Sequence, residues 1–332
     1  MNTFTAFRIR ESDGKISAGF EPLTVEQLTP GDVVVQVQYS GINYKDALAA
    51  TGAGRILRRY PLVGGIDLAG VVRSSQDARY QPGDAVLVTG SGLSETLDGG
   101  YAEFARVPGN AVIPMPAGLD AFRAMALGTA GFTAALAIHR MEKNGQAPER
   151  GKIVVTGATG GVGSIAIDML ATRGYEVVAV SGKKESTDYL LSLGASSVIA
   201  RGEFPLGTRA LEAAKFAGAI DSVGGEMLAG LTRQMDFWGN IASVGLAGGA
   251  ELNTTVMPFI LRGVNLLGIN SSATRREERL EVWRRISTDL TPRHLDRIAQ
   301  RTIPFDQLPG AFQAHIDGKV TGRTVVKISE ID

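Results

Sequence analysis

The sequence predicts an α/β protein in which a doubly wound parallel sheet is joined to a second, mostly β domain. A short β-branched strand beginning at Ile153 runs into glycines and straight out into an apolar helix that ends near Thr172. Strands and helices then alternate, which is the pattern that builds a parallel sheet of the Rossmann type. Over roughly the first 120 residues the chain instead forms short alternating strands separated by Gly, Pro and Asp, as in a small β domain.

The length of 332 residues exceeds one usual hydrophobic core and favours two domains. We expect residues 1–125 and 300–332 to form the mostly β domain, because the stretch from Thr302 to Ile328 returns to short strands and one helix. Residues 126–299 are then expected to form the parallel-sheet domain.

In the first domain one helix, from Tyr44 to Ala50, interrupts the strands and is followed by a basic turn, Gly54 to Pro61. From Ala121 to Met141 the apolar pattern becomes helical. The expected strands of this domain are Thr3 to Arg10, Val33 to Tyr39, Ala69 to Arg73, Ala85 to Thr89 and Tyr101 to Val107.

In the second domain five further strands follow the one at Ile153, and the apolar residues between Arg275 and Leu290 predict a surface helix. The five strands are Glu176 to Ser181, Ser197 to Ala200, Ala219 to Val223, Asn240 to Gly245 and Asn265 to Asn270.

The turn after the Ile153 strand has the composition of a phosphate cradle. Gly157, Gly160, Gly161 and Gly163 let backbone N–H groups and the positive end of the following helix approach a pyrophosphate. Glycines alone are a weak signal, but a strand before them, a helix after them and a second strand complete a βαβ unit. A dinucleotide is therefore expected here.

The end of the second strand indicates which dinucleotide binds. An NAD site usually offers an acid to the ribose 2′-hydroxyl, whereas here the chain reads Ser181-Gly182-Lys183-Lys184, and Arg201 follows the next strand. A 2′-phosphate matches such cationic donors, so NADPH is favoured. The alternative is that these are ordinary solvated surface cations.

Composition excludes several classes of function. Lys plus Arg equals Asp plus Glu at 34 each, so no net field attracts nucleic acid or an anionic membrane surface. The N-terminal residues carry no apolar signal segment, and we expect a cytoplasmic protein with no membrane partner. Zero cysteines and three scattered histidines make a zinc site improbable.

Six motifs spread over the whole chain resemble the medium-chain dehydrogenase/reductase superfamily, zinc-free quinone oxidoreductase branch. They are Gly41 to Asp46, Pro61 to Gly70, Gly99 to Phe104, Gly128 to Ala134, Ala158 to Gly163 and Gly322 to Val326. Shorter motifs, Ser181 to Lys183, Tyr189 to Ala195 and Leu267 to Ser271, resemble its acryloyl-CoA reductase subgroup, long labelled a putative quinone oxidoreductase. The resemblance implies a GroES-like first domain and a Rossmann second domain.

Where zinc-using relatives place Cys and His-Glu, this chain has Asn43 and Ile66-Asp67, so metal-assisted alcohol oxidation is out of reach. Without a metal, the remaining chemistry is hydride donation to an acceptor activated by hydrogen bonding, such as an α,β-unsaturated thioester.

Asn43 and Tyr44 are expected to form the polar wall of the catalytic pocket, because an amide and a phenol offer donors to a developing oxyanion. Alternatively Asn43 only caps the helix that begins there, and Tyr44 only packs against the nicotinamide. Asp46 and Asp67 are expected to be structural hydrogen-bond acceptors, and Arg55, Arg58 and Arg59 either reach the phosphates of a CoA tail or form a solvated turn.

The resemblance implies cofactor contacts at residues in three groups. The pyrophosphate group is Thr159, Gly160, Gly161 and Val162; the adenosine phosphate group is Ser181, Gly182, Lys183 and Arg201; the nicotinamide group is Tyr44, Leu246, Ile260 and Ser271. For Leu246 and Ile260, core packing is an equally good interpretation without the resemblance.

Three functions remain open at this point. The first is NADPH-dependent reduction of the carbon–carbon double bond of a short 2-enoyl-CoA, most simply acryloyl-CoA to propanoyl-CoA. The second is an NADPH-dependent quinone reductase of the same fold, and the third is a non-catalytic NADPH-binding protein; the fold alone does not rank them. The superfamily also implies a homodimer, with the strand from Val264 to Ile269 pairing across subunits.

Overall fold

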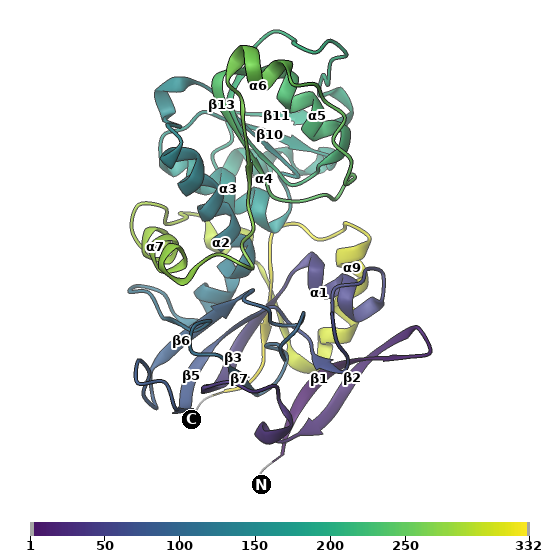
Figure 1. Cartoon of the computed structure of the whole chain (residues 1–332), viewed down its shortest axis with the longest axis vertical. Helices are drawn as coiled ribbons and strands as arrows, with labels where there is room; N and C mark the ends of the chain where they lie inside the picture. Colours follow the sequence, from purple (N-terminus) through teal and green to yellow (C-terminus); the bar gives the residue numbers. More distant parts are fainter. Residues whose placement is uncertain (1–2, 331–332) are drawn as a thin grey trace. The chain divides into compact units, whose positions relative to one another are not determined.

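The computed structural model describes residues 3–330, which form two compact units (Figure 1). The first unit comprises residues 3–130, 271–287 and 295–330, and the second comprises Gly131–Asn270 and Thr288–His294. The predicted fold class, a parallel Rossmann-type sheet plus a mostly β domain, is confirmed.

The first unit is built on a larger mixed sheet and a smaller antiparallel one. The larger sheet has the order β15-β16-β3-β5-β6-β8, with β7 also paired to β3, and the smaller has the order β2-β1-β4. Its strands are β1 Phe4–Ser12, β2 Lys15–Leu23, β3 Val33–Ile42, β4 Leu62–Val63, β5 Asp67–Ser75, β6 Ala85–Thr89, β7 Phe104–Val107, β8 Ile113–Pro114, β15 Arg301–Pro304 and β16 Thr324–Lys327.

Valines on alternate positions of β3 are fully buried and form the centre of this unit's core. β16, from the far end of the chain, runs antiparallel to β3 with Val326 opposite Ser40. The helices of this unit are α1 Tyr44–Thr51, the first part of α2 Ala121–Lys143, α7 Arg276–Ile286, α8 Leu295–Ile298 and α9 Leu308–Ile316, with short 3₁₀ turns at Val25–Gln27 and Phe305–Gln307.

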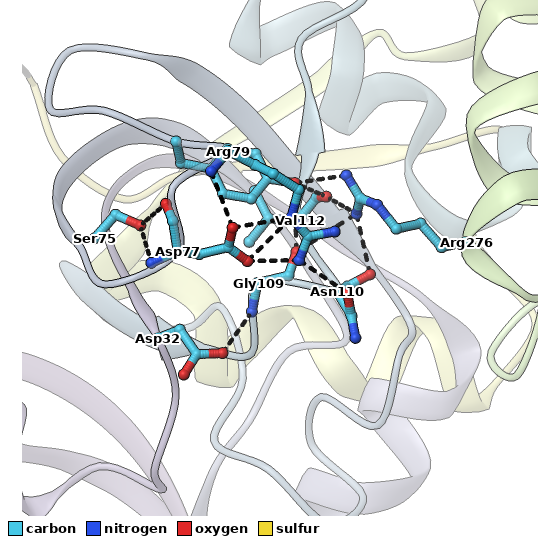
Figure 2. Close-up of polar contacts among 9 residues, drawn as sticks. Asp32, Ser75, Asp77, Arg79, Gly109, Asn110, Val112 and Arg276 are labelled. Atoms are coloured by element: carbon cyan, nitrogen blue, oxygen red, sulfur yellow. Dashed lines mark hydrogen bonds and ion pairs between the residues drawn. The ribbon is translucent and has the colours of Figure 1, made fainter.

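The helix α7 belongs to the first unit rather than to the parallel-sheet unit in which residues 126–299 were expected. Arg276 donates to the carbonyl of Asn110 at 3.2 Å and to the Tyr80 hydroxyl at 2.7 Å (Figure 2). Arg279, only 2% exposed, donates to the Thr89 carbonyl at 2.8 Å. These side chains of α7 fasten it to the β unit, so the expected boundary at residue 299 is corrected.

The other boundary falls inside α2, at Ala130, rather than at residue 125. Gly128 within α2 has a left-handed φ of 52° and interrupts the helix. α2 is also long and apolar enough to cross a membrane by length and composition, but 78% of the apolar window is buried inside the fold, as in the core helix of a globular domain.

The second unit is a six-stranded sheet, parallel throughout, with the order β11-β10-β9-β12-β13-β14. This is the order of a doubly wound dinucleotide-binding fold, in which the direction of winding reverses between β9 and β12. The strands are β9 Ile153–Thr156, β10 Val177–Ser181, β11 Ser197–Ala200, β12 Phe216–Asp221, β13 Met235–Ser243 and β14 Asn265–Gly268.

Helices cover this sheet and its ends. They are the remainder of α2, α3 Gly161–Thr172, α4 Thr187–Ser192, α5 Gly225–Gln234 and α6 Met257–Arg262, with 3₁₀ turns at Pro148–Arg150, Lys184–Ser186 and Arg201–Glu203. All residues of β9 and β12 are buried, as expected for central strands of a parallel sheet.

Candidate functional site

The glycine turn of the second unit presents free backbone donors. β9 ends at Thr156, Gly157 turns the chain with φ of 59°, and α3 begins after Gly160. The N–H of Ser164 donates to the Gly160 carbonyl at 2.9 Å, so the N–H groups before it, of residues 161–163, point out of the helix end. Together with the helix dipole they suit an anion.

A close approach of α3 to the turn fixes this geometry. A Cβ on Gly163 would lie 2.5 Å from the Gly157 carbonyl oxygen, closer than any real contact. Gly163 is therefore required for packing, while Gly160 and Gly161 leave the mouth of the turn without side chains. Val162 and the buried Thr159 complete the turn, and the whole cradle fits a dinucleotide pyrophosphate.

The reversal of strand order lies directly beside this turn. Thr156, the last residue of β9, donates its hydroxyl to Asp221 Oδ1 at 2.5 Å, and Asp221 is the last residue of β12. The Gly224 N–H donates to Asp221 Oδ2 at 2.8 Å, and burial raises the pKa of this carboxyl. Ligands of open α/β sheets bind in the crevice outside such strand ends.

The cations expected to recognise a 2′-phosphate lie together at the end of β10. Arg201 places its guanidinium carbon 3.3 Å from where a Cβ on Gly182 would be, so the guanidinium covers this glycine. The Lys183 N–H donates to Ser181 Oγ at 3.0 Å. Burial lowers the pKa of Lys183, an ammonium that a bound anion would compensate. Lys184 instead points to Glu203, at 3.8 Å.

Leu246 and Ile260 are 67% and 72% exposed, which rules out core packing for both side chains. Their apolar atoms are available to a ligand or to another protein surface.

The first unit holds a buried polar cluster where α1 begins. Asn43 precedes α1, and its Nδ2 donates to Asp67 Oδ2 at 2.8 Å and to Asp46 Oδ2 at 3.1 Å. Arg323 Nη1 donates to Asn43 Oδ1 at 2.9 Å. The amide of Asn43 is thus fully occupied by two carboxylates and a guanidinium, and it does not offer a free donor to a substrate.

Asp46 and Asp67 are both structural acceptors within this cluster. Asp46 accepts the N–H of Ile66 at 2.9 Å, and Asp67 accepts the N–H of Thr129 at 2.9 Å. Burial, followed by the Asp67 charge, raises the pKa of Asp46 to about 7. One buried guanidinium, on Arg323, faces the charges of both acids, so holding a proton on Asp46 lowers the electrostatic cost of the buried cluster.

Two glycines make room for the cluster. A Cβ on Gly41 would lie 2.7 Å from Arg323 Nη2, and one on Gly128 would lie 2.6 Å from both Arg323 Nη2 and Asp67 Oδ2. The break in α2 at Gly128 also aims the Thr129 hydroxyl at Asp67 Oδ1, at 2.5 Å. The motifs containing Gly41 and Gly128 therefore serve one ion cluster.

Tyr44, the first residue of α1, is 51% exposed, so its phenol is available to a ligand. Ser271 also belongs to the first unit, where its carbonyl accepts a hydrogen bond from Arg279 Nη2 at 2.8 Å. The structure thus places Tyr44, Asn43 and Ser271 in one unit and the other predicted cofactor residues, from Thr159 to Ile260, in the second.

Asn43 and Asp67, which the resemblance expects in place of zinc ligands, are engaged by Arg323 and Thr129. Among residues 3–330 no group of three or more His, Cys, Asp or Glu side chains is arranged to hold a metal ion.

Comparison with known proteins identifies the family. Residues 29–117 match the alcohol dehydrogenase GroES-like domain, and residues 161–288 match the zinc-binding dehydrogenase family. The chain belongs to the medium-chain dehydrogenase/reductase superfamily. The expected resemblance is therefore confirmed, including the GroES-like character of the first domain.

Curated relatives match nearly the full length. A putative quinone oxidoreductase of Bacillus subtilis, YhfP, is 46% identical over 98% of this chain and 99% of its own. Acrylyl-CoA reductase AcuI of Ruegeria pomeroyi is 47% identical over 96% of this chain and 97% of its own, and the probable acrylyl-CoA reductase AcuI of Escherichia coli is 48% identical over 98% and 99%.

Solved structures carry the cofactor in this fold. Escherichia coli YhdH with bound NADPH superposes with a TM-score of 0.94 at 48% identity, covering 98% of this chain and 100% of that one. Bacillus subtilis YhfP with NAD bound gives 0.95 at 45% identity with the same coverage. One of these two relatives was thus solved with NADPH and the other with NAD.

Sequence reasoning missed the two residues that organise the first-unit cluster. Arg323 stood out only as part of a family motif, because a lone Arg between Gly322 and a strand gives no sign of burial. Thr129 was likewise hidden in an apolar helical pattern. Gly128, beside Thr129, was the available signal, since a glycine inside a helix often marks a close approach.

Proposed function

We propose that this protein reduces the carbon–carbon double bond of a short 2-enoyl-CoA with NADPH, acryloyl-CoA to propanoyl-CoA being the simplest case. The observation that carries the proposal is the near full-length match to two acrylyl-CoA reductases at 47–48% identity. The second unit adds a cofactor cradle and a cation pair suited to a 2′-phosphate, Lys183 and Arg201.

The residues proposed to hold NADPH are those of the glycine turn and of the β10 end. The N–H groups of Gly161 and Val162 face the pyrophosphate, and Ser181, Lys183 and Arg201 face the 2′-phosphate. Bound NADPH supplies the hydride that adds to the β carbon of the substrate. Leu246, Ile260 and Ser271 are proposed on the nicotinamide side.

The protein's own contribution is to orient the substrate and stabilise charge. Negative charge develops on the thioester oxygen, and a phenol hydrogen bond from Tyr44 stabilises it there. Asn43 is proposed to act through Tyr44 rather than on the substrate, because its amide ties the start of α1 to Asp67. Water then delivers the proton to the α carbon.

The deciding experiment is an NADPH oxidation assay that compares kcat/KM for acryloyl-CoA, crotonyl-CoA and a 1,4-quinone. The proposal expects acryloyl-CoA to be preferred. A higher kcat/KM for the quinone would establish the second candidate, quinone reduction, which the name of the YhfP relative favours. Failure to oxidise NADPH with any acceptor, despite tight NADPH binding, would point to a non-catalytic protein.

We also propose a homodimer that acts in the cytoplasm without a nucleic-acid or membrane partner. Within residues 3–330 β14 pairs with β13 alone and leaves an open edge, and Trp238 of β13 and Leu266 of β14 are 66% and 37% exposed. Antiparallel pairing of the β14 strands of two subunits would fill the open strand edge and cover the exposed apolar side chains. Light scattering of Leu266→Asp against the unmodified protein tests the dimer.

A further inference from the structure

The loop that follows α1 in the first unit carries three arginines with no partner. Arg55, Arg58 and Arg59 are exposed, and within residues 3–330 none of their guanidinium groups makes a hydrogen bond, an ion pair or a ring contact. Three unpaired cations within five residues create a local positive potential in a chain whose net charge is zero.

Two acidic residues that contact this loop or the residue just after β4 begins, Glu95 and Asp98, are already engaged. Glu95 pairs with Lys45, and Asp98 accepts the N–H groups of Val63 and Thr29, each at 2.7 Å. The positive charge of the loop is therefore not neutralised by the carboxylates that its own backbone contacts bring close.

The loop is also held in place, so its cations are presented in a defined arrangement. Leu57, 1% exposed, anchors its centre in the core, and the Arg58 N–H donates to the Glu95 carbonyl at 2.8 Å. A Cβ on Gly54 would lie 3.2 Å from Leu48 of α1, so the loop packs directly on the helix. Ordered cations bind a polyanion at lower entropic cost than mobile ones.

The loop continues from the helix that begins with Tyr44. α1 has eight residues, about 12 Å of helix, between the exposed phenol and the start of the loop. A substrate that places a thioester at Tyr44 and a phosphorylated nucleotide at the loop needs a long, uncharged arm between them, which is the layout of CoA.

We infer that Arg55, Arg58 and Arg59 bind the phosphates of the 3′-phospho-ADP moiety of a CoA thioester. The inference rests on the proposed function and names the residues that make the site select CoA thioesters over the same acyl group on a shorter carrier. Phosphate oxygens accept the planar guanidinium donors, and the exposed setting makes each contact modest and salt-sensitive.

The test compares two substrates with the same reacting group, acryloyl-CoA and acryloyl-pantetheine, which lacks the nucleotide. Replacing all three arginines with Ala is expected to raise KM for acryloyl-CoA roughly tenfold, two- to threefold for each exposed contact, with kcat retained. KM for acryloyl-pantetheine should not change. Adenosine 3′,5′-bisphosphate should inhibit the unmodified protein competitively with acryloyl-CoA and lose this effect in the variant.

Matched variants control for general effects. Arg73→Ala removes another exposed arginine of the same unit, on β5, and should leave both KM values unchanged. Replacing the three arginines with Lys keeps the charge and should restore most of the affinity for acryloyl-CoA.

Three outcomes would overturn the inference. An equal rise of KM for both substrates would show that the loop shapes the acyl site, and a parallel rise of KM for NADPH would assign the cations to the dinucleotide. An unchanged KM for acryloyl-CoA would show that the three arginines are only solvated and do not contact the substrate. If the unmodified protein reduces neither thioester, the proposed function itself fails and this inference falls with it.

Discussion

Arg323 places its guanidinium 3.8 Å from the carboxylate of Asp67, and the two side chains are only 3% and 0% exposed. They come from opposite ends of the first unit's chain, one just before β16 and the other at the start of β5. The relationship makes the position of α1, and hence of Tyr44, dependent on a buried ion cluster.

Replacing Arg323 with Met should therefore destabilise the protein strongly. Removing one partner of a buried ion pair leaves an uncompensated charge, which typically costs about 3–5 kcal/mol. Urea unfolding measures the loss, and Arg301→Met, the same change at an exposed position of β15, is the control. A loss below about 1 kcal/mol would mean that the Arg323–Asp67 pair does not hold the cluster together.

The cluster also predicts a pH dependence of stability. The pKa of Asp46 rises from 3.8 to about 7 on folding, so between these values the folded protein holds a proton that the unfolded chain has released. Asp46 therefore contributes stability that is present below pH 4 and lost as the pH rises toward 7, with a slope of at most about 1.4 kcal/mol per pH unit.

In Asp46→Asn this contribution to the slope should vanish, whatever the absolute stability of the variant. Urea midpoints at several pH values between 4 and 7 measure it, and Asp306→Asn, an exposed carboxylate, is the control. Identical slopes in Asp46→Asn and the unmodified protein would contradict the raised pKa.

Arg201→Ala should weaken NADPH binding by about 1–2 kcal/mol while leaving NADH binding nearly unchanged, because the guanidinium beside Gly182 is proposed to contact the 2′-phosphate, which NADH lacks. Titration of both cofactors decides between this role and a structural one. Lys184→Ala, whose ammonium points to Glu203, is the matched control and should have little effect. Equal losses for the two cofactors would assign Arg201 to the fold or to the pyrophosphate.

Tyr44→Phe should reduce kcat less than tenfold, below about 1.4 kcal/mol of barrier, because the hydrogen bond of a half-exposed phenol to the oxyanion is screened by water and water supplies the proton. Steady-state kinetics with acryloyl-CoA, together with NADPH titration to confirm intact binding, measures the effect. A loss beyond a hundredfold would make Tyr44 the catalytic acid.

Exhaustive chelation should leave activity intact, because the ligand positions of metal-using relatives carry Asn43 and Asp67, both bonded to other side chains. Metal analysis before and after chelation accompanies the assay. A stoichiometric zinc whose removal abolishes turnover would overturn the zinc-free assignment.

Local sequence was enough to predict the strand from Ala85 to Thr89 and the start of α1 at Tyr44, because turn residues and alternation are local signals. It did not reveal β2, Lys15–Leu23, whose residues are mostly exposed or half-buried and carry little apolar alternation. It also placed α7 in the wrong unit, since nothing local shows that Arg276 and Arg279 hold the backbone of a distant β segment.

In the candidate site, too, local features were predictable from sequence and long-range ones were not. The phosphate cradle was predictable because its glycines and its βαβ order lie within 30 residues. The cluster of Asn43, Asp67 and Arg323 was not, because it joins three segments up to 280 residues apart. The Asn43 amide bonds Asp46, Asp67 and Arg323, so its side chain belongs to the buried cluster and is not a free donor to a substrate.

The pairing of β16 with β3 sets the order in which the two units can form. The parallel sheet of the second unit needs only residues between Ile153 and Gly268, whereas β3 receives one of its neighbours from Thr324–Lys327. During synthesis the larger sheet of the first unit therefore stays open beside β3 until Thr324–Lys327 have left the ribosome. The parallel sheet of the second unit can therefore form before the larger sheet of the first unit is complete. Asp46 and Asp67 cannot pair with Arg323 until that residue has been synthesised.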